Sequence, residues 1–145
     1  MTSKRLSVVQ GVKSLIVMAA PAATVIGFDE DASKPEIIPA GGLILGEAGD
    51  PTEVDVTLSP PIWSYEHRIP VEVTMPPGMD DTALDAVLVP IGNGIAADPY
   101  LGGLVDYLTC TAPNITSEAL TGTEAIRIAA FDIVAHYTSS NPLGG

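Results

Sequence analysis

The chain has 145 residues, enough for one domain over residues 1–145 with its own core, and 46% of them are hydrophobic but only 17% charged. So little charge, against about 25% in an ordinary soluble domain, predicts a surface that other subunits cover. Eighteen acidic against six basic side chains give a net charge of −12, and there is one cysteine; these features exclude a protein that grips duplex DNA through many phosphate contacts, a disulfide framework and a cysteine-based zinc site.

The first part of the chain is predicted to hold one helix and two short strands. Apolar residues recur at three- and four-residue steps over residues 3–20, which predicts a helix that Pro21 ends. Basic residues followed by an apolar stretch are also typical of a signal peptide, but the stretch is too short to span a bilayer, and we expect a helix. Short strands are predicted at 24–28 and 43–47, and the polar loop between them holds Asp29, Glu30 and Asp31.

The most regular pattern in the sequence predicts a long β-hairpin. Apolar and polar residues alternate over 52–58 and again over 62–75, on either side of a Pro-rich turn. We expect this hairpin to project beyond the domain and to pair with a neighbouring subunit. Because Pro70 has no N–H to donate, its strand is expected to lie at a sheet edge or to break at that point. The apolar face of the hairpin is expected to include Trp63 and Tyr65.

A second helix is predicted over residues 80–97. An aspartate at its start is the expected N-cap, and Pro90 is expected to kink the helix because it has no N–H for the preceding turn. The loop at 98–103 that follows is framed by an Asp-Pro pair and a Gly-Gly pair, and it holds Tyr100 and Leu101.

The rest of the chain is predicted to complete a sheet. A strand is expected at 104–111, with a helix as the alternative, then a loop at 113–123 and a last strand at 125–138. The apolar phase of the last strand changes near Ala129, which predicts a β-bulge. We therefore expect an α+β fold: a mixed, mainly antiparallel sheet with two helices packed on one face and a long projecting β-hairpin. The predicted core or interface residues are Trp63, Ile69, Val71, Leu84, Leu88, Ile91, Ile128, Phe131 and Ile133.

The sequence contains no recognisable catalytic constellation, and we expect no enzyme, no cofactor and no bound metal. The two histidines, His67 and His136, have no nucleophile beside them and are expected to be structural. The acidic segment 29–31 lacks the residue order of a calcium loop. Cys110 follows an apolar stretch and is expected to be inert.

Three stretches carry a resemblance to one known family. They are the alternating run from Trp63 to Val73, the helix and loop from Ala83 to Tyr107, and the ending from Ile126 to Leu143. Over residues 60–145 the chain resembles the tail terminator proteins of long-tailed, lambda-like bacteriophages. The resemblance implies a homohexameric ring that caps the head-proximal end of the tail tube, ends tube polymerisation and joins the tail to the head.

The same resemblance implies the partners and the location of the protein. The partners would be further copies of the chain, the tail tube protein and the head-tail connector or stopper protein. DNA would pass through the ring without specific binding, and no membrane would be involved. The protein would assemble in the host cytoplasm and reside in the neck of the virion.

Two alternatives stay open. Another neck or tail component, such as a head-tail joining protein or a tail tube subunit, would share this composition. A small-ligand-binding or acyl-transfer protein would instead be a monomer or dimer with a preformed apolar pocket. For the acyl-transfer alternative, the sequence offers no recognisable nucleophile.

The candidate functional residues are of two kinds. Side chains of the hairpin and of the loop at 98–103 are expected to contact a neighbouring subunit or ring: Trp63, Tyr65, Tyr100 and Leu101. Carboxylates in loops and on the polar face of the hairpin are expected to line an acidic channel that repels passing DNA: Asp29, Glu30, Asp31, Asp50, Glu53 and Asp55. The alternative for these carboxylates is that they only keep the outer surface soluble.

Overall fold

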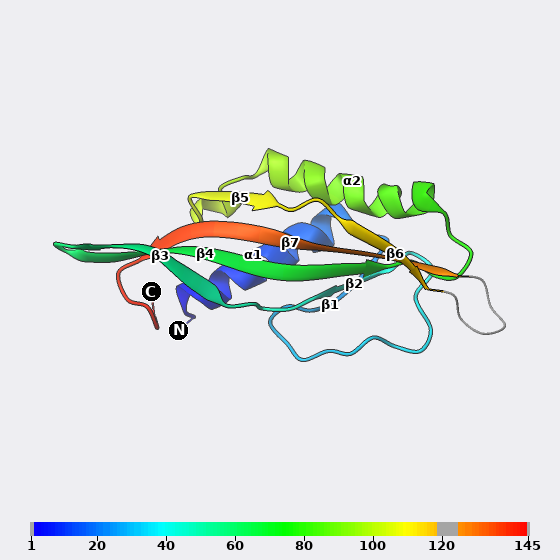
Figure 1. Ribbon diagram of the computed structural model, residues 1–145, viewed down its shortest axis with the longest axis horizontal. Helices are drawn as coiled ribbons and strands as arrows, with labels where there is room; N and C mark the ends of the chain where they lie inside the picture. Colours follow the sequence, from blue (N-terminus) through cyan, green and yellow to red (C-terminus); the bar gives the residue numbers. More distant parts are fainter. Residues whose placement is uncertain (1, 119–124, 145) are drawn as a thin grey trace.

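The computed structural model describes residues 2–118 and 125–144, and within them the chain forms two α-helices, one 3₁₀ helix and a seven-stranded sheet. In chain order (Figure 1) the elements are α1 (Lys4–Ala19), β1 (Thr24–Gly27), β2 (Leu43–Gly46), β3 (Pro51–Leu58), β4 (Pro61–Thr74), α2 (Asp81–Ala97), η1 (Leu101–Gly103), β5 (Tyr107–Cys110), β6 (Asn114–Glu118) and β7 (Ile126–Ser139). The predicted α+β class, with two helices and a mixed, mainly antiparallel sheet, is confirmed.

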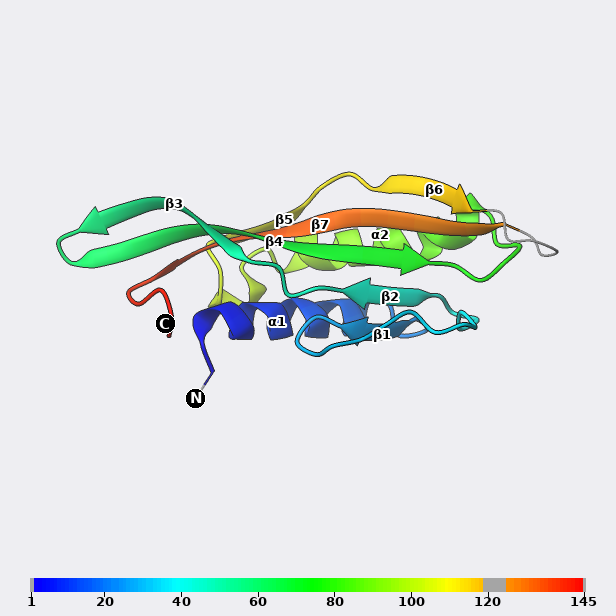
Figure 2. The same ribbon diagram turned by 60° about the horizontal axis from the view of Figure 1, so that its bottom comes forward.

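Two long antiparallel strands, β4 and β7, form the centre of the sheet. They pair without a register shift, from Trp63 opposite Ser139 to Thr74 opposite Ile128. On the outer side of β4 lie β3 and β2, and β2 pairs in parallel with β1. On the outer side of β7 lie β5 and β6 (Figure 2). Every pairing except that of β1 with β2 is antiparallel.

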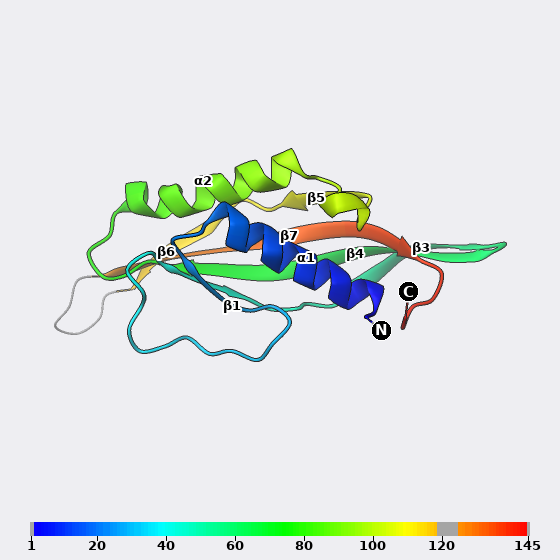
Figure 3. The same ribbon diagram turned by 180° about the vertical axis from the view of Figure 1, so that it is seen from behind.

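Both helices pack on the face of the sheet that the odd-numbered residues of β4 and β7 form (Figure 3). The helices contribute the buried side chains Val8, Val9, Val12, Ile16, Leu84, Val87, Ile91 and Ile95. The predicted core residues buried on this face are Ile69, Val71, Leu84, Ile91, Phe131 and Ile133. Trp63 and Leu88 are partly buried against the same core, whereas Ile128 is buried on the opposite face of the sheet.

Each α-helix begins at a side-chain cap. The Ser3 hydroxyl accepts a hydrogen bond from the Leu6 N–H at 3.2 Å, and an Asp80 carboxylate oxygen accepts one from the Ala83 N–H at 3.0 Å. Such caps satisfy N–H groups that have no partner inside the helix. The second helix continues through Pro90 as far as Ala97.

Pro70 lies in a central strand, so the expectation of an edge or a broken strand is wrong. On one side β4 pairs with β7 from Trp63 to Thr74. On the other side its partner changes from β3, whose pairing reaches His67, to β2, whose pairing begins at Val71. Pro70 falls in this gap, where no ladder needs its missing N–H. Its carbonyl oxygen still accepts a hydrogen bond from the Glu47 N–H at 3.0 Å.

The last strand, β7, has no bulge, contrary to the prediction. Its pairing with β4 continues through Ala129 and Ala130 in one register. Ile126 and Ile128 are buried on one face of the sheet, and Phe131 on the other. The change of apolar phase therefore arises because both faces of this strand bury apolar side chains, not because a residue is inserted.

A strand, β6, occupies Asn114–Glu118, where the sequence predicts a loop at 113–123. Its side chains are exposed, and it pairs along the edge of β7. A short, polar edge strand has no alternating pattern by which to recognise it. Residues 119–123 of the predicted loop lie outside the described residues. The strand predicted at 104–111 is shorter, Tyr107–Cys110, and follows the turn of η1.

Candidate interaction surfaces

The strand β3 and the first half of β4, residues 51–67, form a ribbon whose tip lies beyond both helices (Figure 1). From Trp63 onwards the other edge of β4 pairs with β7, so only the tip of the ribbon is two-stranded. The apolar side chains near its tip face water: Val54, Val56, Leu58 and Ile62. Leu58 is 78% exposed. A strand edge with exposed apolar side chains is a surface to which another chain can bind. The ribbon is therefore the first candidate contact surface.

A β-bulge at Val54 separates the two carboxylates of the ribbon. Glu53 pairs with Tyr65 and Asp55 with Ser64, so Val54 is the extra residue on β3. Because cross-strand partners project to the same face, Glu53 lies on the helix side of the sheet and Asp55 on the other side. The prediction that both lie on one polar face is wrong.

The aromatic candidates of the ribbon differ in accessibility. Trp63 pairs with Val56 and is only partly buried, so part of its indole remains available to a neighbour. Tyr65 is 9% exposed and belongs to the core. Its side chain therefore presents little surface to another subunit.

The loop at 98–103 likewise offers one candidate and buries the other. Tyr100 is 61% exposed, whereas Leu101 is buried against α1. A Cβ atom added to Gly11 would lie 3.0 Å from Leu101 Cδ2, so a larger residue at this position would force the leucine to shift. Asp98 Oδ1 accepts a hydrogen bond from the Gly102 N–H at 3.0 Å and holds the turn. Leu101 thus anchors the loop, and Tyr100 is its available side chain.

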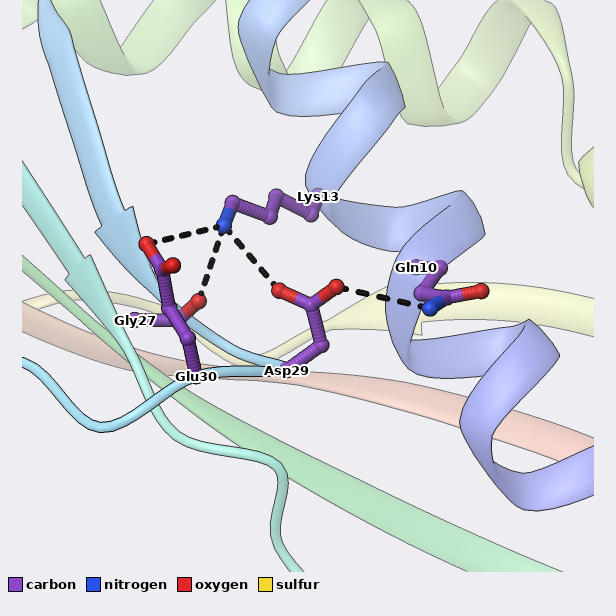
Figure 4. Close-up of polar contacts among 5 residues, drawn as sticks. All are labelled: Gln10, Lys13, Gly27, Asp29 and Glu30. Carbon is purple, nitrogen blue, oxygen red and sulfur yellow. Dashed lines mark hydrogen bonds and ion pairs between the residues drawn. The ribbon is translucent and has the colours of Figure 1, made fainter.

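Two of the acidic candidates form a structural cluster with Lys13 (Figure 4). Lys13 Nζ lies 3.0 Å from Asp29 Oδ1 and 3.4 Å from Glu30 Oε1, and it donates to the Gly27 carbonyl at 3.1 Å. The Lys13 ammonium, through its hydrogen bond to Asp29, holds the pKa of that carboxyl below its usual value. The cluster ties α1 to the end of β1, and Lys13 offsets part of the acidic charge there.

The other acidic candidates are exposed, and none forms an ion pair with another described residue. They are Asp31, Asp50, Glu53 and Asp55. They come from the loop after β1, from the segment before β3 and from β3 itself. The structure therefore does not gather these carboxylates into one cluster.

The face of the sheet away from the helices carries charges that the sequence analysis did not single out. Arg68 lies 3.3 Å from Glu66 and 3.4 Å from Asp132, and Lys34 pairs with Glu72. Glu66, Arg68, Glu72 and Asp132 alternate with the buried residues of β4 and β7, so the alternation itself was the signal that could have identified these four.

His67 is fully buried and joins three parts of the fold. Its Nε2 lies 2.7 Å from the Ala48 carbonyl oxygen, which can only accept, so Nε2 carries the proton. Nδ1 then accepts a hydrogen bond from the Tyr137 hydroxyl at 2.9 Å. Burial lowers the pKa of His67. These bonds connect β4 with β7 and with the segment before β3, which is the root of the ribbon.

His136 has a different environment from His67. It is partly buried on the face away from the helices, and its ring stacks on Tyr107 with 4.1 Å between ring centroids and 15° between planes. Across β4 and β7 it is the register partner of Glu66. Its contacts are those of a surface side chain, with no nucleophile among the partners found in the described part of the chain.

Within residues 2–118 and 125–144, no group of three or more His, Cys, Asp or Glu side chains is arranged to hold a metal ion. In the same residues no helix is both long and apolar enough to cross a membrane. No protein-family model and no curated protein sequence matches the chain.

Proposed function

We propose that the chain is a structural subunit of a bacteriophage neck, which assembles into a closed ring of six copies at the head-proximal end of the tail tube. The ring ends tube polymerisation and joins the tail to the head-tail connector. The resemblance of residues 60–145 to tail terminators supports this function. The structural observation that carries it is the tip of the ribbon, where Val54, Val56, Leu58 and Ile62 are exposed.

In this proposal the ribbon and Tyr100 contact a neighbouring copy or an adjacent ring. A closed ring needs a heterologous interface, in which two different surfaces of each copy meet. Large permanent interfaces are more apolar than ordinary surface, and the exposed Val56, Leu58 and Tyr100 supply apolar area of this kind. Trp63 extends the same surface towards the core.

The channel of the proposed ring is acidic. Its candidate carboxylates are Asp31, Asp50, Glu53 and Asp55, and Asp29 and Glu30 contribute less because Lys13 pairs with both. A focused negative potential repels the phosphates of DNA, so the duplex stays mobile in the channel. The ring thus guides DNA without binding it, and the subunit performs no catalysis.

The mass of the assembly tests this function. Native mass spectrometry of the purified protein should give a complex of six copies of the 14.9 kDa chain. When the protein is mixed with tail tube protein, the tubes should stop growing once they are capped. Tubes that grow without limit from this chain alone would identify a tube subunit and contradict a terminator. A monomer or dimer that never associates with tubes would contradict both.

A further inference from the structure

A cavity of about 350 Å³ lies where the two ends of the chain meet the sheet. Figure 3 shows both chain ends beside the root of the ribbon. The cavity is bounded by the first turn of α1, by the start of β3 and by the segment after β7. The polar residues that line it and carry the following steps are Ser3, Lys4, Arg5, Tyr65 and Tyr137. None of these belongs to the proposed channel.

The cations at this cavity have no counterion among the described residues. The other four basic residues, Lys13, Lys34, Arg68 and Arg127, each form an ion pair within 4.0 Å. Lys4 and Arg5 form no ion pair with any described residue, and they lie in the first turn of a 16-residue helix that has no acidic residue in that turn. The positive end of a helix disfavours cations. An anion bound in the cavity would offset the unfavourable interaction between these two cations and the helix N-terminus.

Tyr65 provides a second, independent indication of a ligand. It is 9% exposed, and its hydroxyl makes no hydrogen bond to any described residue. Since no fully buried side-chain N or O atom in the described chain lacks a partner, this hydroxyl reaches solvent, through the cavity that Tyr65 lines. Burial and the carboxylate of Glu53 raise the pKa of Tyr65. The hydroxyl therefore keeps a proton that it can donate.

The neighbouring hydroxyls already have partners. The Tyr137 proton is donated to His67 Nδ1, because the other ring nitrogen of His67 donates to Ala48, and burial raises the pKa of Tyr137 to about 12. The Ser3 hydroxyl caps the Leu6 N–H. The donors that remain for an anion include the Tyr65 O–H, the two cationic side chains, the Asn141 side-chain amide and the first N–H groups of α1, which have no intrahelical partner.

We propose that this cavity binds a dianionic phosphate group, as inorganic phosphate or as the phosphomonoester of a small molecule, through Tyr65, Arg5 and Lys4. Two cations beside a helix N-terminus match a dianion better than a monoanionic carboxylate. The volume exceeds that of phosphate alone and falls at the lower end of small-molecule pockets. Glu53 pairs with Tyr65 across the ribbon and opposes the bound charge. This phosphate site is a separate proposal from the ring, and it does not depend on ring formation.

Titration with potassium phosphate at constant ionic strength tests the site. The readouts are calorimetry and the fluorescence of Trp63, the only tryptophan in the chain and two residues from Tyr65. We expect saturable binding of phosphate, weaker binding of acetate and no response to chloride. Glycerol phosphate distinguishes the two sources: tighter binding than inorganic phosphate identifies a phosphomonoester site, and equal binding a site for the free ion. Absence of saturable phosphate binding would overturn the proposal.

Matched variants locate the binding. Tyr65→Phe removes only the hydroxyl and breaks no hydrogen bond within the described chain, and it should weaken phosphate binding about tenfold, the effect of one charge-assisted bond. Arg5→Gln, at an exposed position, should do the same, whereas Glu53→Gln should tighten binding. Tyr107→Phe and Arg68→Gln make the same changes on the opposite face and should leave the affinity unchanged. If both Tyr65→Phe and Arg5→Gln bind phosphate as tightly as the wild type, the proposed site is overturned. This result would not depend on the oligomeric state of the protein.

Discussion

The helix-covered part of β4 and the tip of the ribbon both have an alternating sequence, but they use its apolar side chains differently. From Ile69 to Val73 its odd-numbered side chains lie beneath the two helices and are fully or almost fully buried. At the tip of the ribbon the side chains of β3 on this face, Val56 and Leu58, are exposed instead. Alternation thus specifies a strand with two chemically different faces. Whether the apolar face stabilises the subunit depends on what packs against it.

The energetic roles of the two regions should therefore differ. In the helix-covered region, burial of apolar area stabilises the folded subunit itself. At the tip of the ribbon, an exposed apolar side chain contributes in this way only when another surface covers it. Four substitutions or changes of condition test this difference, from the largest expected effect to the smallest.

Ile133→Ala should lower the free energy of unfolding by about 2–5 kcal/mol, because it opens a cavity in a fully packed core. Ile133 is fully buried opposite Ile69. Urea denaturation followed by circular dichroism measures the change. A loss below about 1 kcal/mol would mean that the helices do not hold this face as tightly as described.

Tyr137→Phe should cost about 1–3 kcal/mol, since it removes one hydroxyl and leaves Nδ1 of the buried His67 without a donor. The same denaturation experiment measures it. Tyr107→Phe is the control, because Tyr107 is half exposed and makes no side-chain hydrogen bond to the described residues. Equal effects of the two substitutions would show that the hydrogen bond between Tyr137 and His67 does not stabilise the root of the ribbon.

Acid should destabilise the subunit through His67. Burial lowers the pKa of His67 in the folded state, whereas the unfolded chain has a value of about 6.5. The unfolded state therefore binds the proton first, and stability that is present above a pH of about 6.5 is lost as the pH falls towards the folded pKa. Groups near the ring act in both directions: Arg5 lowers its pKa and Asp50 raises it.

Denaturation between about pH 5 and 8 measures this dependence on His67. His67→Gln should flatten the loss of stability near pH 6, while His136→Gln, at the partly exposed histidine, should keep it. A slope that disappears with His136 rather than with His67 would contradict the assignment of the buried neutral tautomer.

Leu58→Asp should change the free energy of unfolding by no more than about 0.5 kcal/mol, because the side chain has no cover in the subunit. It should nevertheless weaken the proposed ring, as measured by native mass spectrometry at decreasing protein concentration. Ile37→Asp is the matched control, since Ile37 is 84% exposed but lies outside the ribbon. A ring that survives Leu58→Asp unchanged would exclude the tip of the ribbon from its interface.

Elements with a strong apolar periodicity could be predicted from the sequence, whereas features that depend on which strands pair could not. The helices and the long strands β4 and β7 carry strong periodic patterns, and their positions are confirmed. Pro70 was misplaced because a change of partner strand at that point leaves no trace in the sequence of β4 itself. The strand β6 was missed because it pairs with β7 through backbone hydrogen bonds while its side chains are all exposed, so the sequence shows no apolar alternation there.

The candidate residues show the same limit. Tyr65 and Leu101 are apolar or aromatic, as contact residues often are, but the helices and Gly11 bury them. The bulge at Val54 moved Glu53 to the same face as Tyr65, which no count of alternating residues could reveal. The hydrogen bond between His67 and Tyr137 joins residues 70 positions apart, so it follows from strand register rather than from local sequence.

The unbroken register of β4 on β7 also gives the molecule a mechanical property. A pull on the ribbon tip along the strand axis loads the backbone hydrogen bonds from Trp63 opposite Ser139 to Thr74 opposite Ile128 together, in shear. A sideways force on β3 instead meets its bonds to β4 one after another, as in unzipping. We therefore expect the ribbon to resist a pull along its length more strongly than a force that separates β3 from β4.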